Sequence, residues 1–85
     1  MKEFSYKIKD SVGIHARPAG ELVKTASEFK SSITIKMGEK WADAKKIFSV
    51  MTLGAAQNDE VVVTIDGSDE EIAFEKVKSF FEERL

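Results

Sequence analysis

The fold is decided by the stretch Glu60-Val61-Val62-Val63-Thr64-Ile65-Asp66, the most β-prone run in the chain. Its β-branched side chains pack well on a pleated surface, which predicts a central strand. Asp66-Gly67 then turns the chain. Ser68 and Glu71 have capping-box spacing, so we expect a long helix to open here and to run to about Arg84. Its predicted buried face comprises Ala73, Phe74, Val77, Phe80 and Phe81, with Ile72 at the margin. The acidic run 69–71 is interpreted as capping and solvation rather than catalysis.

Three other stretches alternate between apolar and polar residues, the pattern of half-buried strands. They are residues 2–9, 32–37 and 40–44, and Gly38-Glu39 predicts a tight turn that joins the last two as a hairpin. Trp41 falls on the solvent side of its strand, where we interpret it as a surface aromatic rather than a binding site. The inward positions are Phe4, Tyr6, Ile8, Ile33, Ile35, Met37, Ala42 and Ala44.

Two more helices are predicted from apolar residues at helical spacing. The first begins at Ala16 and runs to about Phe29, with Ala19, Leu22, Val23, Ala26 and Phe29 as its apolar positions. Gly20 lies inside it, and two interpretations stay open: simple tolerance, or close approach of a partner's surface. The second helix covers residues 45–53 and ends before Gly54.

The resulting order is strand, helix, strand, strand, helix, strand, helix. Because alternating strands have one apolar face, we expect an α+β fold in which a four-stranded antiparallel sheet carries its helices on one face. The 85 residues are enough for a single domain, residues 1–85, with a thin core.

Composition excludes several classes of protein. The chain is 42% hydrophobic and 33% charged, as in ordinary globular proteins, and has no apolar stretch long enough to span a membrane. No signal peptide is evident, so we expect a cytoplasmic protein without membrane insertion. With no cysteine and one histidine, neither a metal site nor a cofactor is expected.

Charge is distributed unevenly along the chain. The net charge is −2, yet residues 11–58 carry seven Lys and Arg against four Asp and Glu, whereas residues 59–85 carry three against nine. A basic region favours association with acidic protein surfaces. A nucleic-acid partner is the weaker interpretation, because the region is small and lacks interleaved aromatics.

The candidate chemistry lies in Gly13-Ile14-His15-Ala16-Arg17-Pro18-Ala19, which holds the only histidine. A neutral imidazole nitrogen is a nucleophile near neutral pH. Arg17 offers a planar donor fork for phosphate or carboxylate, and Pro18 suits the first turn of a helix. The stretch therefore places an imidazole at a helix N-terminus, where free amides favour an anion.

This stretch resembles the active-site signature of HPr, the histidine-containing phosphocarrier family of the bacterial sugar phosphotransferase system. Residues 45–54 also resemble the family, and the likeness covers essentially the whole chain. The resemblance implies an open-faced βαββαβα sandwich and a phosphoryl carrier that is a substrate of phosphotransferases rather than an enzyme. It also implies that Nδ1 of His15 takes phosphate from enzyme I, which draws it from phosphoenolpyruvate, and passes it to sugar-specific enzyme IIA domains. We expect a monomer.

The resemblance also implies roles for other residues. Arg17 and the first-turn amides, including that of Ala16, would neutralise the phosphate. A partner surface would comprise Ala16, Gly20, Ile47, Phe48, Met51 and Thr52, with basic support from Arg17, Lys24 and Lys45. The composition of segment 45–53 independently supports such a surface, since a short helix cannot bury all the apolar side chains of this segment. We expect Phe48 and Met51 to be exposed and to form an apolar docking patch.

One departure from the family pattern concerns Lys46. The family usually has serine directly before the Ile47-Phe48 pair, and in many Gram-positive members a regulatory kinase phosphorylates that serine. Lys46 has no hydroxyl, so the resemblance does not imply this regulation here. A cation at a helix N-terminus opposes the helix dipole, and we hypothesise that Lys46 strengthens docking to an acidic partner.

Two alternatives to a sugar-system carrier remain open. One is a regulatory binding module of the same fold, and the other is a carrier in a nitrogen-related branch of the system; His15 and Arg17 do not separate them. An independent hydrolase or acid-base enzyme is disfavoured, because no second nucleophile, metal set or carboxylate pair accompanies His15.

Overall fold

The computed structural model describes residues 1–85 and contains four strands and three helices in the order βαββαβα, as the sequence predicts. The elements are β1 (Lys2–Lys7), α1 (Ala16–Ala26), β2 (Ser32–Met37), β3 (Lys40–Asp43), α2 (Ile47–Thr52), β4 (Glu60–Asp66) and α3 (Glu70–Arg84). No helix is both long enough and apolar enough to cross a lipid bilayer.

β4 is an inner strand of the sheet, as its composition predicts. The strand order is β1-β4-β2-β3 with antiparallel neighbours, so β4 pairs with β1 on one side and β2 on the other. Val63 stands opposite Phe4 and Ile35 in these two pairings. The strand alternates between buried Val61, Val63 and Ile65 and half-buried Val62 and Thr64. One face is therefore core, and the other faces solvent.

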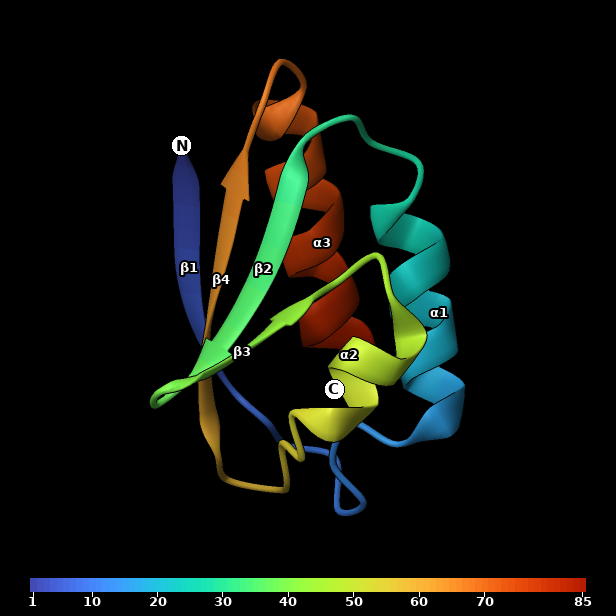
Figure 1. Ribbon diagram of the computed structural model, residues 1–85. Coiled ribbons are helices and arrows are strands. Elements are labelled where there is room, and N and C mark those ends of the chain that lie inside the picture. Colours follow the sequence, from blue (N-terminus) through green and yellow to red (C-terminus); the bar gives the residue numbers. More distant parts are fainter.

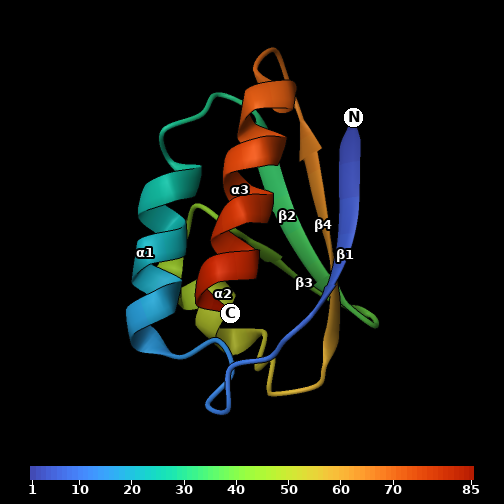
Figure 2. The ribbon, with the colours of Figure 1, turned by 180° about the vertical axis from the view of Figure 1, so that it is seen from behind.

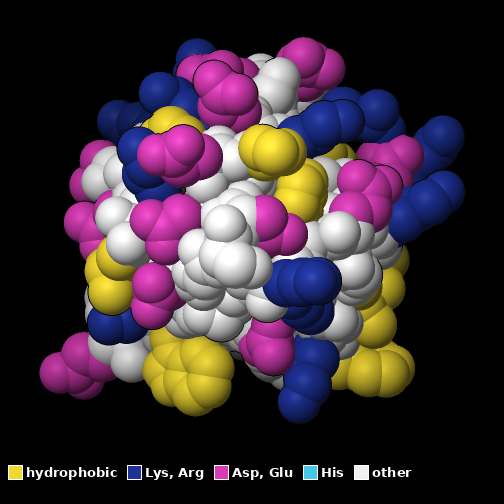
Figure 3. Space-filling model, turned by 90° about the horizontal axis from the view of Figure 1, so that it is seen from above, with side chains coloured by type: hydrophobic (Ala, Val, Ile, Leu, Met, Phe, Trp, Pro, Cys, Tyr) yellow, Lys and Arg dark blue, Asp and Glu magenta, His cyan; other side chains and the backbone are white.

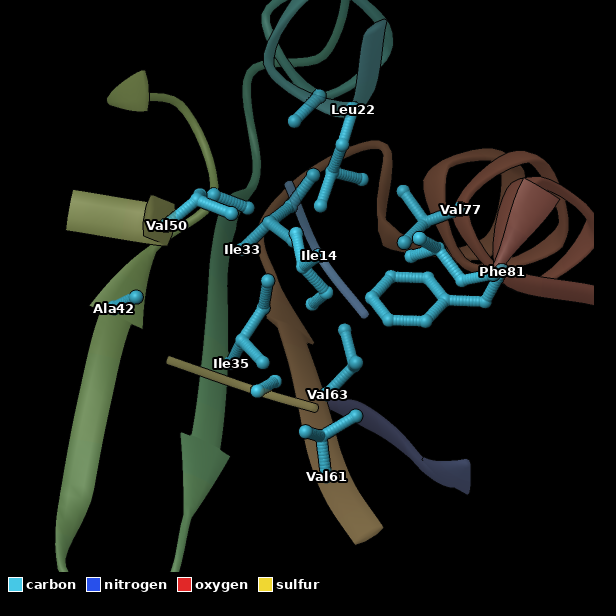
Figure 4. Packing of buried hydrophobic residues seen from close by; sticks show 14 of the residues in the cluster. Ile14, Leu22, Ile33, Ile35, Ala42, Val50, Val61, Val63, Val77 and Phe81 are labelled. Atoms are coloured by element: carbon cyan, nitrogen blue, oxygen red, sulfur yellow. The ribbon is translucent and has the colours of Figure 1, made fainter. Parts of the chain in front are cut away.

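The helices cover only the apolar face of the sheet (Figures 1 and 2). Figure 4 shows Leu22 of α1 and Val77 and Phe81 of α3 pointing toward the side chains of the sheet. The Phe81 ring meets Phe4 and Tyr6 of β1 edge-on, with centroids 5.6 Å apart in each pair. Twenty buried hydrophobic residues form one continuous core between the layers. The predicted fold class is thus confirmed.

Several predicted boundaries shift by one to three residues. α1 ends at Ala26 instead of Phe29, because the amides of Glu28 and Phe29 donate to carbonyls three residues back and tighten the chain into turns. β1 ends at Lys7, and α2 covers Ile47–Thr52 within the predicted residues 45–53. The core positions are unaffected by these shifts.

The predicted capping box at the start of α3 does not form. The N-cap residue is Asp69 rather than Ser68, and its side chain makes no capping hydrogen bond. Instead, the Asp69 carboxylate accepts hydrogen bonds from the amides of Lys30 and Ser31 and from the Ser31 hydroxyl, at 2.8, 2.9 and 2.5 Å. Ser31 is fully buried, so its polar groups need partners from the protein. The spacing of residues 68–71 could not reveal that the Asp69 carboxylate accepts hydrogen bonds from a loop nearly forty residues earlier in the chain.

The same contact changes the acidity of Asp69. The hydrogen bond from the Ser31 hydroxyl, followed by that from the Lys30 amide, lowers the pKa of Asp69 from 3.8 to about 2. Both bonds favour the charged form. Asp69 therefore acts as a structural clamp between the start of α3 and the loop after α1.

Replacing Asp69 with alanine should destabilise the protein in a pH-dependent way. The pKa of Asp69 is lower in the folded than in the unfolded chain, so its stabilisation is present above about pH 4 and is lost as pH falls toward 2. Denaturant unfolding should show the largest difference between wild type and Asp69→Ala at neutral pH, shrinking between pH 4 and 2. Glu71→Ala, at an exposed acid of the same helix start, is the control and should leave the free energy of unfolding at neutral pH close to that of wild type.

Candidate functional site

His15 stands at the N-terminus of α1, as the sequence predicts. It is the N-cap residue, with extended backbone angles (φ −98°, ψ −176°), and its carbonyl accepts the Ala19 amide at 2.9 Å. The imidazole makes no capping hydrogen bond and is partly exposed. The amides of Ala16 and Arg17 lie in the first turn, where a helix offers no acceptor. A reactive ring and two donors therefore share one helix end.

The loop before His15 is held against the loop that follows α2. Gly13 has φ +77°, and a Cβ built on it would lie 2.4 Å from the Ala55 carbonyl oxygen and 2.8 Å from Ala56 Cα. The next residue, Ile14, is buried and donates its amide to the Ala55 carbonyl at 3.0 Å. Only glycine permits this close approach. The position of His15 thus depends on a contact with a segment some forty residues away.

The end of α3 also meets the His15 loop. The Leu85 carbonyl accepts the amides of Lys9 and Asp10 at 2.6 and 2.8 Å, and Arg84 forms an ion pair with Glu21 of α1. These contacts enclose a shallow hollow of about 230 Å³ lined by Asp10, His15, Arg17, Pro18, Glu21 and Arg84. Sequence reasoning missed Asp10, Glu21 and Arg84, because no local pattern indicates that the C-terminal turn reaches residue 15.

Two larger hollows lie around the start of α3, but their chemistry does not suit a phosphate site. They measure about 420 and 470 Å³ and are lined mainly by residues 68–72 and 71–75, which include several carboxylates. Figure 3 views the molecule from the end where β4 passes into α3, and no histidine is visible there. No group of three or more metal-binding side chains is assembled anywhere. The hollow beside His15 is smaller, but its lining includes an imidazole and two guanidinium groups, so we take it as the candidate site.

The second group of predicted residues lies on α2 and the facing side of α1. The predicted exposure of Phe48 and Met51 is confirmed: they are 79% and 40% exposed, whereas Ile47 is half-buried. A Cβ added at Gly20 of α1 would meet Ile47 Cδ1 at 3.6 Å, an ordinary contact distance. The structure therefore brings Gly20 and Ile47 together from separate helices. Ala16 and Thr52 are exposed as well.

The predicted basic residues differ in how they are held. Lys24 and Lys46 are exposed, whereas Lys45 is half-buried and its ammonium donates to the Phe29 carbonyl at 2.6 Å. Lys45 is thus tied to the segment beyond the C-terminal end of α1, while His15 stands at the N-terminal end. Trp41 is 66% exposed on β3, confirming its predicted outward direction.

Comparison with known proteins identifies the family. A family model described as the phosphorylation site of the PTS HPr component matches residues 2–83. The chain belongs to the HPr family. The phosphocarrier protein HPr of Mycoplasma capricolum is 42% identical over 78 residues, covering 92% of this chain and 88% of its own. HPr proteins are components of the phosphotransferase system and carry phosphate, so the resemblance seen in the sequence is confirmed.

Solved HPr structures share the fold. A Mycoplasma histidine-containing phosphocarrier protein superposes with a TM-score of 0.93 at 39% identity, covering 96% of this chain and 93% of that one. An HPr from Thermoanaerobacter tengcongensis, described as a dimer, gives a TM-score of 0.78 at 39% identity and covers 99% and 97%. The expectation that the present chain is a monomer stays a prediction.

Replacing Gly13 with alanine should disturb both stability and the His15 loop. The added Cβ overlaps the Ala55 carbonyl, and positive φ alone costs an L-residue about 1–2 kcal/mol. We expect the free energy of unfolding in urea to fall by at least this amount, and hydrogen exchange at the Ile14 amide to become faster. Gly38→Ala is a matched control, because Gly38 also has positive φ (+62°) but nothing lies within 4 Å of its Cβ position. Equal losses in the two variants would show that the contact with Ala55 is unimportant.

Proposed function

We propose that this HPr family member accepts a phosphoryl group on Nδ1 of His15 from enzyme I and passes it to enzyme IIA domains in sugar uptake. The observation that carries the proposal is the partly exposed imidazole at the N-terminus of α1, in an open polar hollow with Arg17. Because the hollow is shallow and faces solvent, two different proteins can reach the same ring in turn.

The chemistry requires a nucleophile and neutralisation of charge. A lone pair on the neutral imidazole forms the N–P bond, while the bond from phosphorus to the donor's leaving atom breaks and its electron pair stays with the donor. The ring's N–H proton remains on the other nitrogen or passes to solvent. Phosphoryl transfer has a loose transition state, so catalysis is mostly positioning and electrostatics. Arg17 and the amides of Ala16 and Arg17 would neutralise the phosphate oxygens.

The proposed docking surface comprises Ala16, Gly20, Lys24, Lys45, Ile47, Phe48, Met51 and Thr52. Its support is the surplus of exposed apolar area on α2, which packs against α1 beside Gly20. A large exposed aromatic next to an adaptable methionine is typical of interfaces. Such a surface would let partner proteins supply the remaining catalytic groups, so that the chain acts as their substrate rather than as an enzyme.

Incubation with enzyme I and phosphoenolpyruvate tests the carrier function. We expect one acid-labile phosphate per chain, detected by mass and by phosphorus NMR, and transfer of that phosphate to an enzyme IIA domain. His15→Ala should take up none, because the chain has no other histidine. Phosphate that persists in His15→Ala, or no labelling of the wild type, would refute the carrier assignment.

Replacing Phe48 with alanine tests the docking surface. At 79% exposure the side chain contributes little to the core, so we expect nearly unchanged stability but a raised KM of enzyme I for the carrier, by about tenfold if Phe48 is an interface hot spot. Trp41→Ala is the matched control, an exposed aromatic on the sheet that should leave KM unchanged. Similar KM values for the two variants would place docking elsewhere.

Lys46→Ser in the same assay tests its proposed attraction for acidic partners. Lys46 is exposed at the N-cap of α2 without a side-chain cap bond. We expect slower association with enzyme I at low salt and no difference at high salt, where the charge is screened. Unchanged association at low salt would remove this role.

A further inference from the structure

We propose that Arg84 is a second phosphate-binding residue of the His15 hollow, released from Glu21 when His15 carries a phosphoryl group. The inference rests on the proposed function. It concerns a residue at the far end of the chain from Arg17, and its basis is that four charged side chains line the same shallow hollow as His15.

The hollow holds two guanidinium groups and two carboxylates. Arg17 and Arg84 provide the positive charges, and Asp10 and Glu21 the negative charges. The Asp10 carboxylate accepts the Val12 amide at 2.8 Å, whereas Glu21 is engaged by Arg84. With a neutral imidazole the charges of these four side chains sum to zero. A phosphoryl group adds about 1.5 to 2 negative charges at neutral pH and leaves the hollow short of cations.

The ion pair between Arg84 and Glu21 is easily exchanged. Their side chains are 48% and 37% exposed, and exposed ion pairs are weak because water competes for both partners. A phosphate offers the guanidinium fork more charge and several acceptor oxygens in a bidentate geometry. When a phosphoryl group forms in the same hollow, Arg84 therefore gains by leaving Glu21.

The backbone keeps Arg84 beside the site. Leu85 is buried, and its carbonyl accepts the amides of Lys9 and Asp10 at the start of the loop that leads to His15. Phe81, one turn earlier in α3, is buried against β1. The last turn of α3 is thus anchored on both sides of Arg84, so only its side chain needs to move. Glu21 then serves to hold the guanidinium near the imidazole before phosphorylation.

The test uses chemically phosphorylated protein, so that it does not depend on enzyme I. Phosphoramidate transfers its phosphoryl group to the imidazole: the P–N bond of the reagent breaks, the N–P bond to His15 forms, and the ring proton leaves with ammonia as ammonium. Phosphorus NMR then gives the pKa of the phosphoryl group from its shift between about pH 5 and 9. A nearby guanidinium favours the dianion and lowers that pKa.

Four variants decide the question. Arg84→Gln should raise the phosphoryl pKa by about 0.5 to 1 unit, less than the largest shifts by a neighbouring charge because the hollow faces water. Glu21→Gln should lower it, since Arg84 then has no competing carboxylate. The double variant Glu21→Gln/Arg84→Gln should still lie above wild type. Lys78→Gln is the control, because Lys78 lies over Phe74 on α3, outside the hollow.

The double variant distinguishes an Arg84 that binds the phosphoryl group from an Arg84 that stays paired with Glu21. If Arg84 stays with Glu21, the pair is neutral, and removing both charges restores the wild-type pKa; that result would overturn the inference. A raised pKa in the double variant supports it even if enzyme I fails to phosphorylate the protein, which would refute only the proposed carrier function. Failure of phosphoramidate to modify His15 would contradict both.

Discussion

The side chains of Val61, Val63 and Ile65 all project from one face of β4, and that face must be kept from water. The free energy of burying it is the main force that draws α1 and α3 onto the sheet, because each helix presents a matching apolar stripe. Phe81 and Val77 reach the sheet from α3, and Leu22 reaches it from α1 (Figure 4). Both helices lie on the same side of the sheet. The end of α3 lies close to α1, where Arg84 forms an ion pair with Glu21.

The candidate site is a consequence of that proximity. The N-terminus of α1 supplies His15 and Arg17, and the end of α3 supplies Arg84. The loop after α2 packs against Gly13 through Ala55 and Ala56. The side chains of His15, Arg17 and Arg84 are not deeply buried. The backbone around them is held by neighbours that are, because Ile14, Ala55 and Leu85 all lie in the core. The core therefore fixes the backbone around the imidazole, while the side chains of the candidate site remain open to solvent.

The surface beside the site differs in character from the hollow itself. The hollow is polar and charged, whereas the Phe48 and Met51 side chains of α2 are apolar and exposed to solvent. The proposed carrier function has two requirements, binding of the phosphate and binding of partner proteins, and these two surfaces match them separately. Charge near the imidazole suits the phosphate, and apolar area suits a protein surface that must bind and then leave.

Much of the fold was determined by the sequence alone. Period-two alternation located three strands, and the run of β-branched residues located β4 and marked it as central. Apolar spacing indicated the buried faces of the helices, because these patterns record which side chains a single element buries. The motif around His15 likewise indicated an imidazole at a helix N-terminus with an arginine beside it. Tertiary structure alone decided that Asp69 clamps Ser31 instead of capping its own helix, that Gly13 is pressed against Ala55, and that Arg84 and Glu21 join the hollow of His15. These contacts join residues 38 to 63 positions apart, and no local pattern encodes them, since they exist only after burial of the sheet has brought the helix ends together.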